Sequence, residues 1–202
     1  MCIRDSSRPS ARLAVLLDSR PAALLLTPGA SADRDHSTLV TLEEALPEIR
    51  VERLTLGTTS VPRAVTTIVE ATEGLAEELG VSTSGIVIGG RSFGGRACSV
   101  AATEGLAVGG LVLLSYPLHP PGKPEKLRTE HFSDIEVPTL FVSGERDPFG
   151  TPDEFAEHLR TIRGATHMEW VNGNHSPKGA AEAEVVKVVR QYLVGGLSLI
   201  HI

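Results

Sequence analysis

The chain has 202 residues, of which 41% are hydrophobic and 22% charged, and its formal net charge is −6. This length and balance fit one folded domain with its own core and exclude a largely disordered chain. The negative charge and the lack of a Lys/Arg cluster argue against nucleic acid as a partner.

The two ends of the sequence have an unusual relation to each other. Residues 1–6 (MCIRDS) and 197–202 (LSLIHI) can be encoded by DNA segments that are reverse complements apart from the outermost base. The pair resembles a transposon end used in preparing sequencing libraries, translated as if it were coding. We therefore expect both hexapeptides to be adapter read-through, and a single natural domain to lie within residues 7–196.

Short strand-like runs alternate with longer amphipathic runs along the chain. The predicted strands are residues 13–17, 22–26, 51–56, 85–88, 110–114, 139–143 and 168–171. The predicted helices are residues 38–46, 61–79, 92–104, 151–162 and 180–193. The strand runs are continuously apolar, which is typical of strands covered on both faces. Their alternation with helices predicts an α/β fold, with a mainly parallel sheet and helices on both of its faces.

Local signals mark the longest helix and one unusual loop. Ser60 is expected to cap the helix 61–79, Pro62 suits its first turn, and Gly80 can end it. Residues 116–134, rich in Pro, Gly, Lys and His, interrupt the alternation of strands and helices. A connection of this length is more often functional than a simple link.

The apolar runs and the number of cysteines bear on membrane association and on the cellular compartment. No apolar run approaches the roughly 20 residues of a membrane helix, and no basic segment precedes an apolar one as in a signal peptide. We therefore expect no membrane association. There are 2 Cys, one of them in the first hexapeptide, so a disulfide framework is excluded and a reducing cytoplasm is expected.

The segment 89–95, Gly-Gly-Arg-Ser-Phe-Gly-Gly, lies between a predicted strand and a predicted helix and contains a G-x-S-x-G pattern. In a nucleophile elbow the serine takes strained backbone angles, and the flanking glycines avoid collisions with neighbouring backbone. Ser92 would then stand at a helix N-terminus, where free N–H groups favour developing negative charge. The N–H of Phe93 is the expected first oxyanion donor. A plain Gly-rich turn is the alternative, and no phosphate-loop pattern is present.

A nucleophilic serine needs a base and an orienting acid, in the chain order Ser, Asp or Glu, His. Asp147 follows the predicted strand 139–143 after a Gly turn and is the expected acid, with Glu145 as its nearest rival. Asp153 falls in the first turn of a helix, where capping is the simpler role. His175 follows the last predicted strand in a Gly-containing loop and is the expected base. Taken singly, Asp147 would be a turn residue and His175 an exposed loop residue.

The second oxyanion donor is expected in the loop after an early strand, residues 27–36. Gly29 permits close approach of the backbone, so the N–H of Gly29, Ala30 or Ser31 can serve. A simple strand–helix turn explains this segment equally well.

Other polar residues carry less information. His119 and Tyr116, in the long segment after the fifth main strand, are candidate pocket residues. No His pair has the spacing of metal ligands and Cys98 has no partner, so neither a metal nor a cofactor is expected. Cys98 is best explained as a small buried hydrophobe.

Several segments occur together in one order: TPGA (27–30), DRDH (33–36), GGRSFGGR (89–96), SYPLHPP (115–121), KLRTE (126–130), FVSG (141–144) before Asp147, and Asn-His (174–175). In this combination the chain resembles a small α/β-hydrolase family of dienelactone-hydrolase-like proteins. Its relatives include a testis-expressed hydrolase-like protein and part of a chromatin-complex subunit. The resemblance implies an α/β-hydrolase fold with Ser92 as nucleophile, Asp147 as acid and His175 as base. Pro28 stands where the family usually has His and has no N–H to donate, so a later residue must supply the donor.

These observations predict a bacterial serine hydrolase that cleaves a small ester-type substrate through an acyl-enzyme. The excess of Arg over Lys in an Ala- and Gly-rich chain suggests the bacterial source. The alternative is an interaction module with the same fold and an inactive triad, since some relatives are non-catalytic. A third hypothesis is a folded but inactive chain that lacks an N-terminal strand.

Overall fold

The computed structural model describes residue 17 and residues 19–195. The strands are β1 (Ala23–Thr27), β2 (Arg50–Arg53), β3 (Ile86–Arg91), β4 (Gly110–Leu114), β5 (Thr139–Gly144) and β6 (Thr166–Val171). The helices are α2 (Ser37–Ala45), α3 (Val61–Leu79), α4 (Phe93–Thr103), α5 (Pro152–His158) and α6 (Ala180–Val194). Short 3-10 turns are η1 (Thr83–Gly85), η2 (Phe132–Asp134) and η3 (Leu159–Thr161). The terminal hexapeptides, and all of the predicted strand 13–17 except Leu17, lie outside the described residues.

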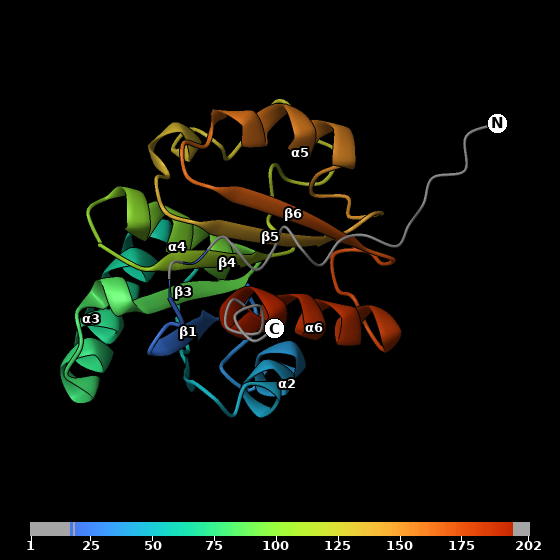
Figure 1. Cartoon of the computed structure of the whole chain (residues 1–202). Helices are drawn as coiled ribbons and strands as arrows, with labels where there is room; N and C mark the ends of the chain where they lie inside the picture. Colours follow the sequence, from blue (N-terminus) through green and yellow to red (C-terminus); the bar gives the residue numbers. More distant parts are fainter. Residues whose placement is uncertain (1–16, 18, 196–202) are drawn as a thin grey trace.

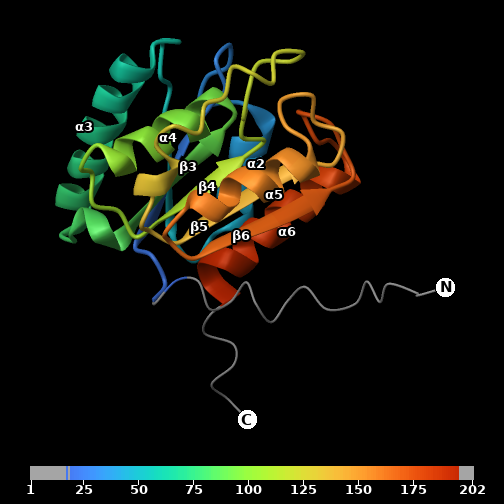
Figure 2. The same ribbon diagram turned by 90° about the horizontal axis from the view of Figure 1, so that it is seen from above.

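The strands form one parallel sheet with the order β2-β1-β3-β4-β5-β6. Residues from α3, α4 and α5 pack in the core on one face, and residues from α2 and α6 pack on the other. Figures 1 and 2 show these two groups of helices on opposite sides of the sheet. The predicted three-layer α/β fold is confirmed.

The inner strands are apolar throughout because successive side chains point to opposite faces and both faces are covered. In β1, Leu25 packs on the side of α3 and α4, whereas Leu24 and Leu26 pack on the side of α2 and α6. In β3, Ile88 and Val87 divide in the same way. A continuous apolar run in the sequence therefore becomes two separate cores.

The two edge strands of this sheet depart from that pattern. β2 spans residues 50–53, whereas the predicted strand was 51–56, and Val51 is its one buried residue. Arg50, Glu52 and Arg53 are charged and at least partly exposed, which discourages pairing of this edge with another chain. In β6 all residues but Val171 are partly exposed. The prediction of coverage on both faces is therefore wrong for the edges.

The predictions for the ends of the longest helix, α3, are partly confirmed. Gly80 ends α3 with φ 65°, and Pro62 lies in its first turn, as predicted. Ser60 occupies the N-cap but its hydroxyl makes no capping hydrogen bond, so that expectation is wrong. Burial of one apolar face, including Ala64 and Ile68, holds α3 on the sheet instead.

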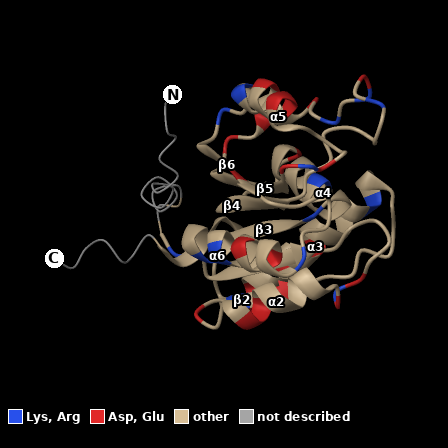
Figure 3. Ribbon diagram, turned by 90° about the vertical axis from the view of Figure 1, so that its right-hand side faces the viewer, with Lys and Arg blue, Asp and Glu red and all other residues tan. Residues whose placement is uncertain are grey.

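The surface carries both signs of charge. Acidic and basic residues are interspersed over α6, whereas α2 and α5 carry Asp or Glu and no Lys or Arg; the sheet lies between the helix layers (Figure 3). None of the helices formed by the described residues has the length and apolar character needed to span a membrane.

β1 and β3 approach each other closely near their carboxyl ends, because both carry small or compact residues there. A Cβ atom at Gly90 would overlap the hydroxyl and carbonyl oxygens of Thr27. The Thr27 hydroxyl itself donates to the Gly89 carbonyl over 3.0 Å. This contact fixes the position of the turn that follows β3.

Gly90→Ala should lower the free energy of unfolding by about 3 kcal/mol or more, because the backbone of β1 cannot move aside without breaking the sheet. Gly74, on the exposed side of α3, has no neighbouring atom within 4 Å of the position that an alanine methyl group would take, so Gly74→Ala is the matched control. It should raise the free energy of unfolding by about 0.5–1 kcal/mol. Urea unfolding of both variants tests the pair, and equal effects would contradict the packing argument.

Candidate active site

Ser92 lies in the sharp turn between β3 and α4. Its backbone angles are φ 52° and ψ −116°, in a region that residues with a Cβ seldom adopt. The Ser92 N–H donates to the Leu114 carbonyl over 2.8 Å, which fixes the turn against β4. A Cβ at Gly94 would overlap the Pro28 carbonyl oxygen, so the first turn of α4 closes on β1 only with glycine there. The strain is therefore held by packing on both sides.

The structure brings Ser92, His175 and Asp147 together. The Ser92 Oγ lies 2.9 Å from His175 Nε2, and His175 Nδ1 lies 2.8 Å from one Asp147 oxygen and 3.0 Å from the other. These residues follow β3, β6 and β5, whose carboxyl ends share one edge of the sheet. With Nδ1–H donating to the carboxylate, Nε2 is free to accept a proton from the serine hydroxyl.

Asp147 has the surroundings of an orienting acid. Its side chain is 1% exposed, and its Oδ1 also accepts the Phe149 N–H over 2.9 Å. The rival Glu145 is exposed and makes no side-chain hydrogen bond to a described residue. Asp153 lies in the first turn of α5, where Thr151 and Glu154 form the capping box. Of these carboxylates, Asp147 alone contacts His175.

His175 is held from two sides. Its ring stacks on Phe149, with ring centroids 4.0 Å apart and an angle of 27° between the planes. On the other side, Arg91 Nη2 donates to the His175 carbonyl oxygen over 2.7 Å and also contacts Ser176 Oγ. The ring and the backbone of this residue are thus fixed separately.

Arg91 joins three segments of the site. It directly precedes Ser92, binds the loop of His175, and lies 3.3 Å from the position of a Gly29 Cβ. Burial lowers the pKa of its guanidinium, and the charge of Asp147 acts in the opposite direction. No carboxylate among the described residues pairs with it. The sequence signal for this role is a basic residue inside the G-x-S-x-G turn, and the sequence analysis gives Arg91 no role.

The expected oxyanion donors flank Ser92. A methyl group at Gly29 would lie 3.8 Å from Ser92 Cβ, which places the loop after β1 beside the serine. The N–H groups of Phe93, Gly29, Ala30 and Ser31 donate no hydrogen bond to a described residue. They are available to a ligand oxygen bound next to Ser92.

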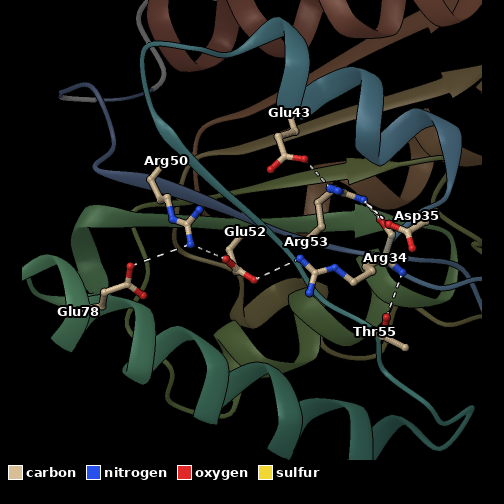
Figure 4. A network of polar contacts seen from close by, with 8 residues as sticks. All are labelled: Arg34, Asp35, Glu43, Arg50, Glu52, Arg53, Thr55 and Glu78. Carbon is tan, nitrogen blue, oxygen red and sulfur yellow. Dashed lines mark hydrogen bonds and ion pairs between the residues drawn. The ribbon is translucent and has the colours of Figure 1, made fainter.

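A polar network fixes the loop after β1 from behind (Figure 4). The Arg53 side chain, 15% exposed, donates to Glu43 over 2.6 Å and to Asp35 over 2.9 Å, and it also contacts the Arg34 carbonyl oxygen. The Thr55 hydroxyl accepts the Arg34 N–H over 3.1 Å. Single exposed ion pairs stabilise little, but this set ties the loop to β2 and α2 together. Sequence reasoning did not find Arg53.

The two candidate pocket residues are both buried. Tyr116 is fully buried beside Phe132, and its hydroxyl donates to the Arg128 carbonyl over 2.8 Å. His119 is buried with Nδ1 2.8 Å from the Pro120 carbonyl oxygen. No hydrogen bond joins either side chain to Ser92, His175 or Asp147. The His119 N–H donates to the carbonyl oxygen of Phe149, the residue whose ring stacks on His175.

Cys98 lies on α4 behind the elbow. Its thiol is fully buried and donates to the Gly89 carbonyl over 3.3 Å. Burial raises the pKa of the thiol to about 12, so the reactive thiolate is scarce. In the part of the chain that the structure describes, no group of three or more His, Cys, Asp or Glu is arranged to hold a metal ion.

Chemically, this arrangement can transfer an acyl group. It combines a hydroxyl, an imidazole oriented by a buried carboxylate, and N–H groups near the serine that donate to no described residue.

Comparisons with known proteins agree with the fold. A family model described as an alpha/beta hydrolase domain matches residues 20–187. A dienelactone hydrolase from Anabaena variabilis is 16% identical, with a TM-score of 0.72 over 89% of this chain and 88% of that one. Est1E from Butyrivibrio proteoclasticus is 15% identical, with a TM-score of 0.69 over 88% of each chain. A thermophilic esterase from Thermogutta terrifontis is 19% identical, with a TM-score of 0.65 over 86% of this chain and 90% of that one.

Arg91→Met should speed backbone hydrogen exchange in residues 173–178, because it removes the donor that holds the His175 carbonyl. The free energy of unfolding should change by less than about 1 kcal/mol, because removal of a buried charge offsets the lost hydrogen bonds. Exchange measured by mass spectrometry gives the first quantity and urea unfolding the second. Arg63→Met, at an exposed site on α3, is the control, and an Arg91 variant whose loop exchanges no faster than this control would contradict the assignment.

Proposed function

The chain belongs to the alpha/beta hydrolase family, and from this we propose that it is a serine hydrolase that cleaves a small ester-type acyl substrate. The observation that carries the proposal is the chain of contacts from Ser92 Oγ to His175 Nε2, 2.9 Å, and from His175 Nδ1 to Asp147, 2.8 Å. The free N–H groups beside Ser92 support it. The esterases among the similar solved structures favour an ester bond as the target.

The first half of the reaction forms an acyl-enzyme. His175 Nε2 accepts the hydroxyl proton as Ser92 Oγ attacks the substrate carbonyl carbon. The carbonyl oxygen becomes an oxyanion, and the N–H of Phe93 and one N–H from residues 29–31 donate to it. The carbon–oxygen bond to the leaving group then breaks, and the imidazolium returns its proton to the departing alcohol.

The second half regenerates the serine. His175 accepts a proton from a water molecule, which attacks the acyl carbon and forms a second oxyanion at the same donors. The bond to Ser92 breaks, the acid leaves, and Ser92 Oγ takes the proton from His175. Asp147 stabilises the imidazolium in both halves and does not itself take the proton.

A fluorophosphonate probe should label the purified protein covalently, because the attack on phosphorus uses the same activated hydroxyl. Ser92→Ala and His175→Ala should both abolish labelling, as followed by gel fluorescence and intact mass. Circular dichroism of each variant checks that the fold is kept. A folded protein that is not labelled would overturn the proposal in favour of an interaction module with an inactive site.

Asp147→Asn should lower kcat/KM on the order of 10⁴-fold for an ester that the unmodified protein hydrolyses, because an amide favours the wrong orientation of the imidazole. Glu145→Gln, which changes an exposed carboxylate two residues away, should leave kcat/KM within about twofold, as for a surface site. Initial rates with a chromogenic short-chain ester provide the comparison. A large loss in the Glu145 variant and a small one in the Asp147 variant would reassign the acid.

A further inference from the structure

The order of the strands divides the carboxyl edge of the sheet into two sides. Ser92 follows β3, while Asp147 and His175 follow β5 and β6, on one side of it. The loop after β1 and the segment after β2, residues 54–60, lie on the other side. This inference rests on the proposed hydrolase function and concerns the substrate of the same site.

Proton transfer assigns the two ends of an ester to these two sides. The leaving oxygen must receive its proton from His175, so the alcohol part lies toward β5 and β6. The carbonyl oxygen points to the N–H groups of Phe93 and the loop after β1. The remaining substituent of the carbonyl carbon is directed toward β1 and β2. We propose that the acyl group occupies the groove between the loop after β1 and residues 54–60, which we term the acyl groove.

The acyl groove is small, and one of its lining residues, Gly29, lies beside the serine. It has a volume of about 410 Å³ and is lined by Gly29, Ala30 and Ala32 on one wall and by Thr55, Thr58 and Thr59 on the other. Gly29 is the residue whose methyl position lies 3.8 Å from Ser92 Cβ. Ligand pockets commonly span about 300–1,000 Å³, so this volume suits a short acyl group.

The lining indicates the chemistry of that group. None of the described residues that line the acyl groove has an ionisable side chain, so the acyl group is uncharged. Thr55 Oγ1 accepts the Arg34 N–H and Thr58 Oγ1 accepts the Ser60 N–H, both over 3.1 Å. Their hydroxyl hydrogens are left to donate to an oxygen of the ligand. The acyl groove therefore fits a short, neutral acyl chain that carries an ether, hydroxyl or keto oxygen.

The side toward β6 differs in charge. A groove of about 430 Å³ beside the loop of His175 is lined in part by Arg146 and Lys178. The basic residues lie in this second groove, whereas the residues that line the acyl groove are neutral. This contrast makes Lys178 a matched control position on the opposite side of Ser92.

The test compares p-nitrophenyl acetate, butyrate, methoxyacetate and octanoate, with each kcat/KM divided by the rate constant of alkaline hydrolysis. Methoxyacetate and butyrate have the same chain length, so the acyl groove should favour methoxyacetate about tenfold, the effect of one good hydrogen bond. Octanoate should be the poorest substrate. Thr58→Val should bring the methoxyacetate-to-butyrate ratio close to one.

Thr59→Trp fills the acyl groove from a residue with no side-chain hydrogen bond to a described residue. It should lower kcat/KM for butyrate and methoxyacetate at least about tenfold relative to acetate. Lys178→Trp should leave the order of the acyl series unchanged. An unchanged series in the Thr59 variant would overturn the inference, even with full fluorophosphonate labelling.

A binding measurement separates this inference from the proposed catalysis. Methoxyacetamide added to the Ser92→Ala protein should shift backbone NMR signals of residues 55–59 and leave those of residues 173–178 in place. Such shifts in a protein that fluorophosphonate does not label would uphold the acyl groove while the hydrolase proposal fails. Absence of shifts at residues 55–59, or shifts confined to residues 173–178, would overturn the acyl groove.

Discussion

The parallel direction of all the strands in this sheet is the constraint on which the site depends. Parallel strands bring their carboxyl ends to one edge, so each strand delivers the loop that follows it to the same surface. Ser92, Asp147 and His175 are far apart in the sequence, yet they follow neighbouring parts of this edge. The close contact of β1 with Gly90 then fixes the serine turn against the loop that carries the free N–H groups. The hydrogen-bond distances among these three side chains therefore depend on the direction of the strands and on two backbone contacts, of β1 with Gly90 and of Ser92 with Leu114.

Sequence reasoning predicted the layers well because the inner strands are buried on both faces and leave long apolar runs. It also placed Ser92 in the turn after β3 and Asp147 and His175 in the loops after β5 and β6, since glycines and strand ends mark those turns. It failed where contacts between distant segments decide the outcome. The edge strand β2 ends at Arg53, although the Leu54 N–H still donates to the Leu26 carbonyl and Leu56 is buried in the core, and a propensity pattern does not show where an edge strand stops.

Arg91 and Arg53 could not be identified from the sequence, and the reason is the same for both. Arg91 and Arg53 act through backbone carbonyl groups and side chains of other loops, so their roles depend on the positions of those loops. Both resemble ordinary charged residues in the sequence. Tyr116 shows a different limit: its place in the long connection suggested a pocket residue, and the structure adds that its ring is buried in the core and that its hydroxyl donates to the Arg128 carbonyl. Burial of one side chain in a long loop is set by packing that the sequence does not display.

Phe149 connects the acid and the base through different parts of one residue. Its N–H binds the Asp147 carboxylate, and its ring lies flat on the imidazole of His175. A histidine ring turned over about its Cβ–Cγ bond would place Cδ2 where Nδ1 now lies and Cε1 where Nε2 now lies, so carbon atoms would face Asp147 and Ser92. With one face covered and one nitrogen held by the carboxylate, that rotation is suppressed. The loss of rotational entropy is then incurred once, when the chain folds, and would not recur in each turnover of the proposed reaction.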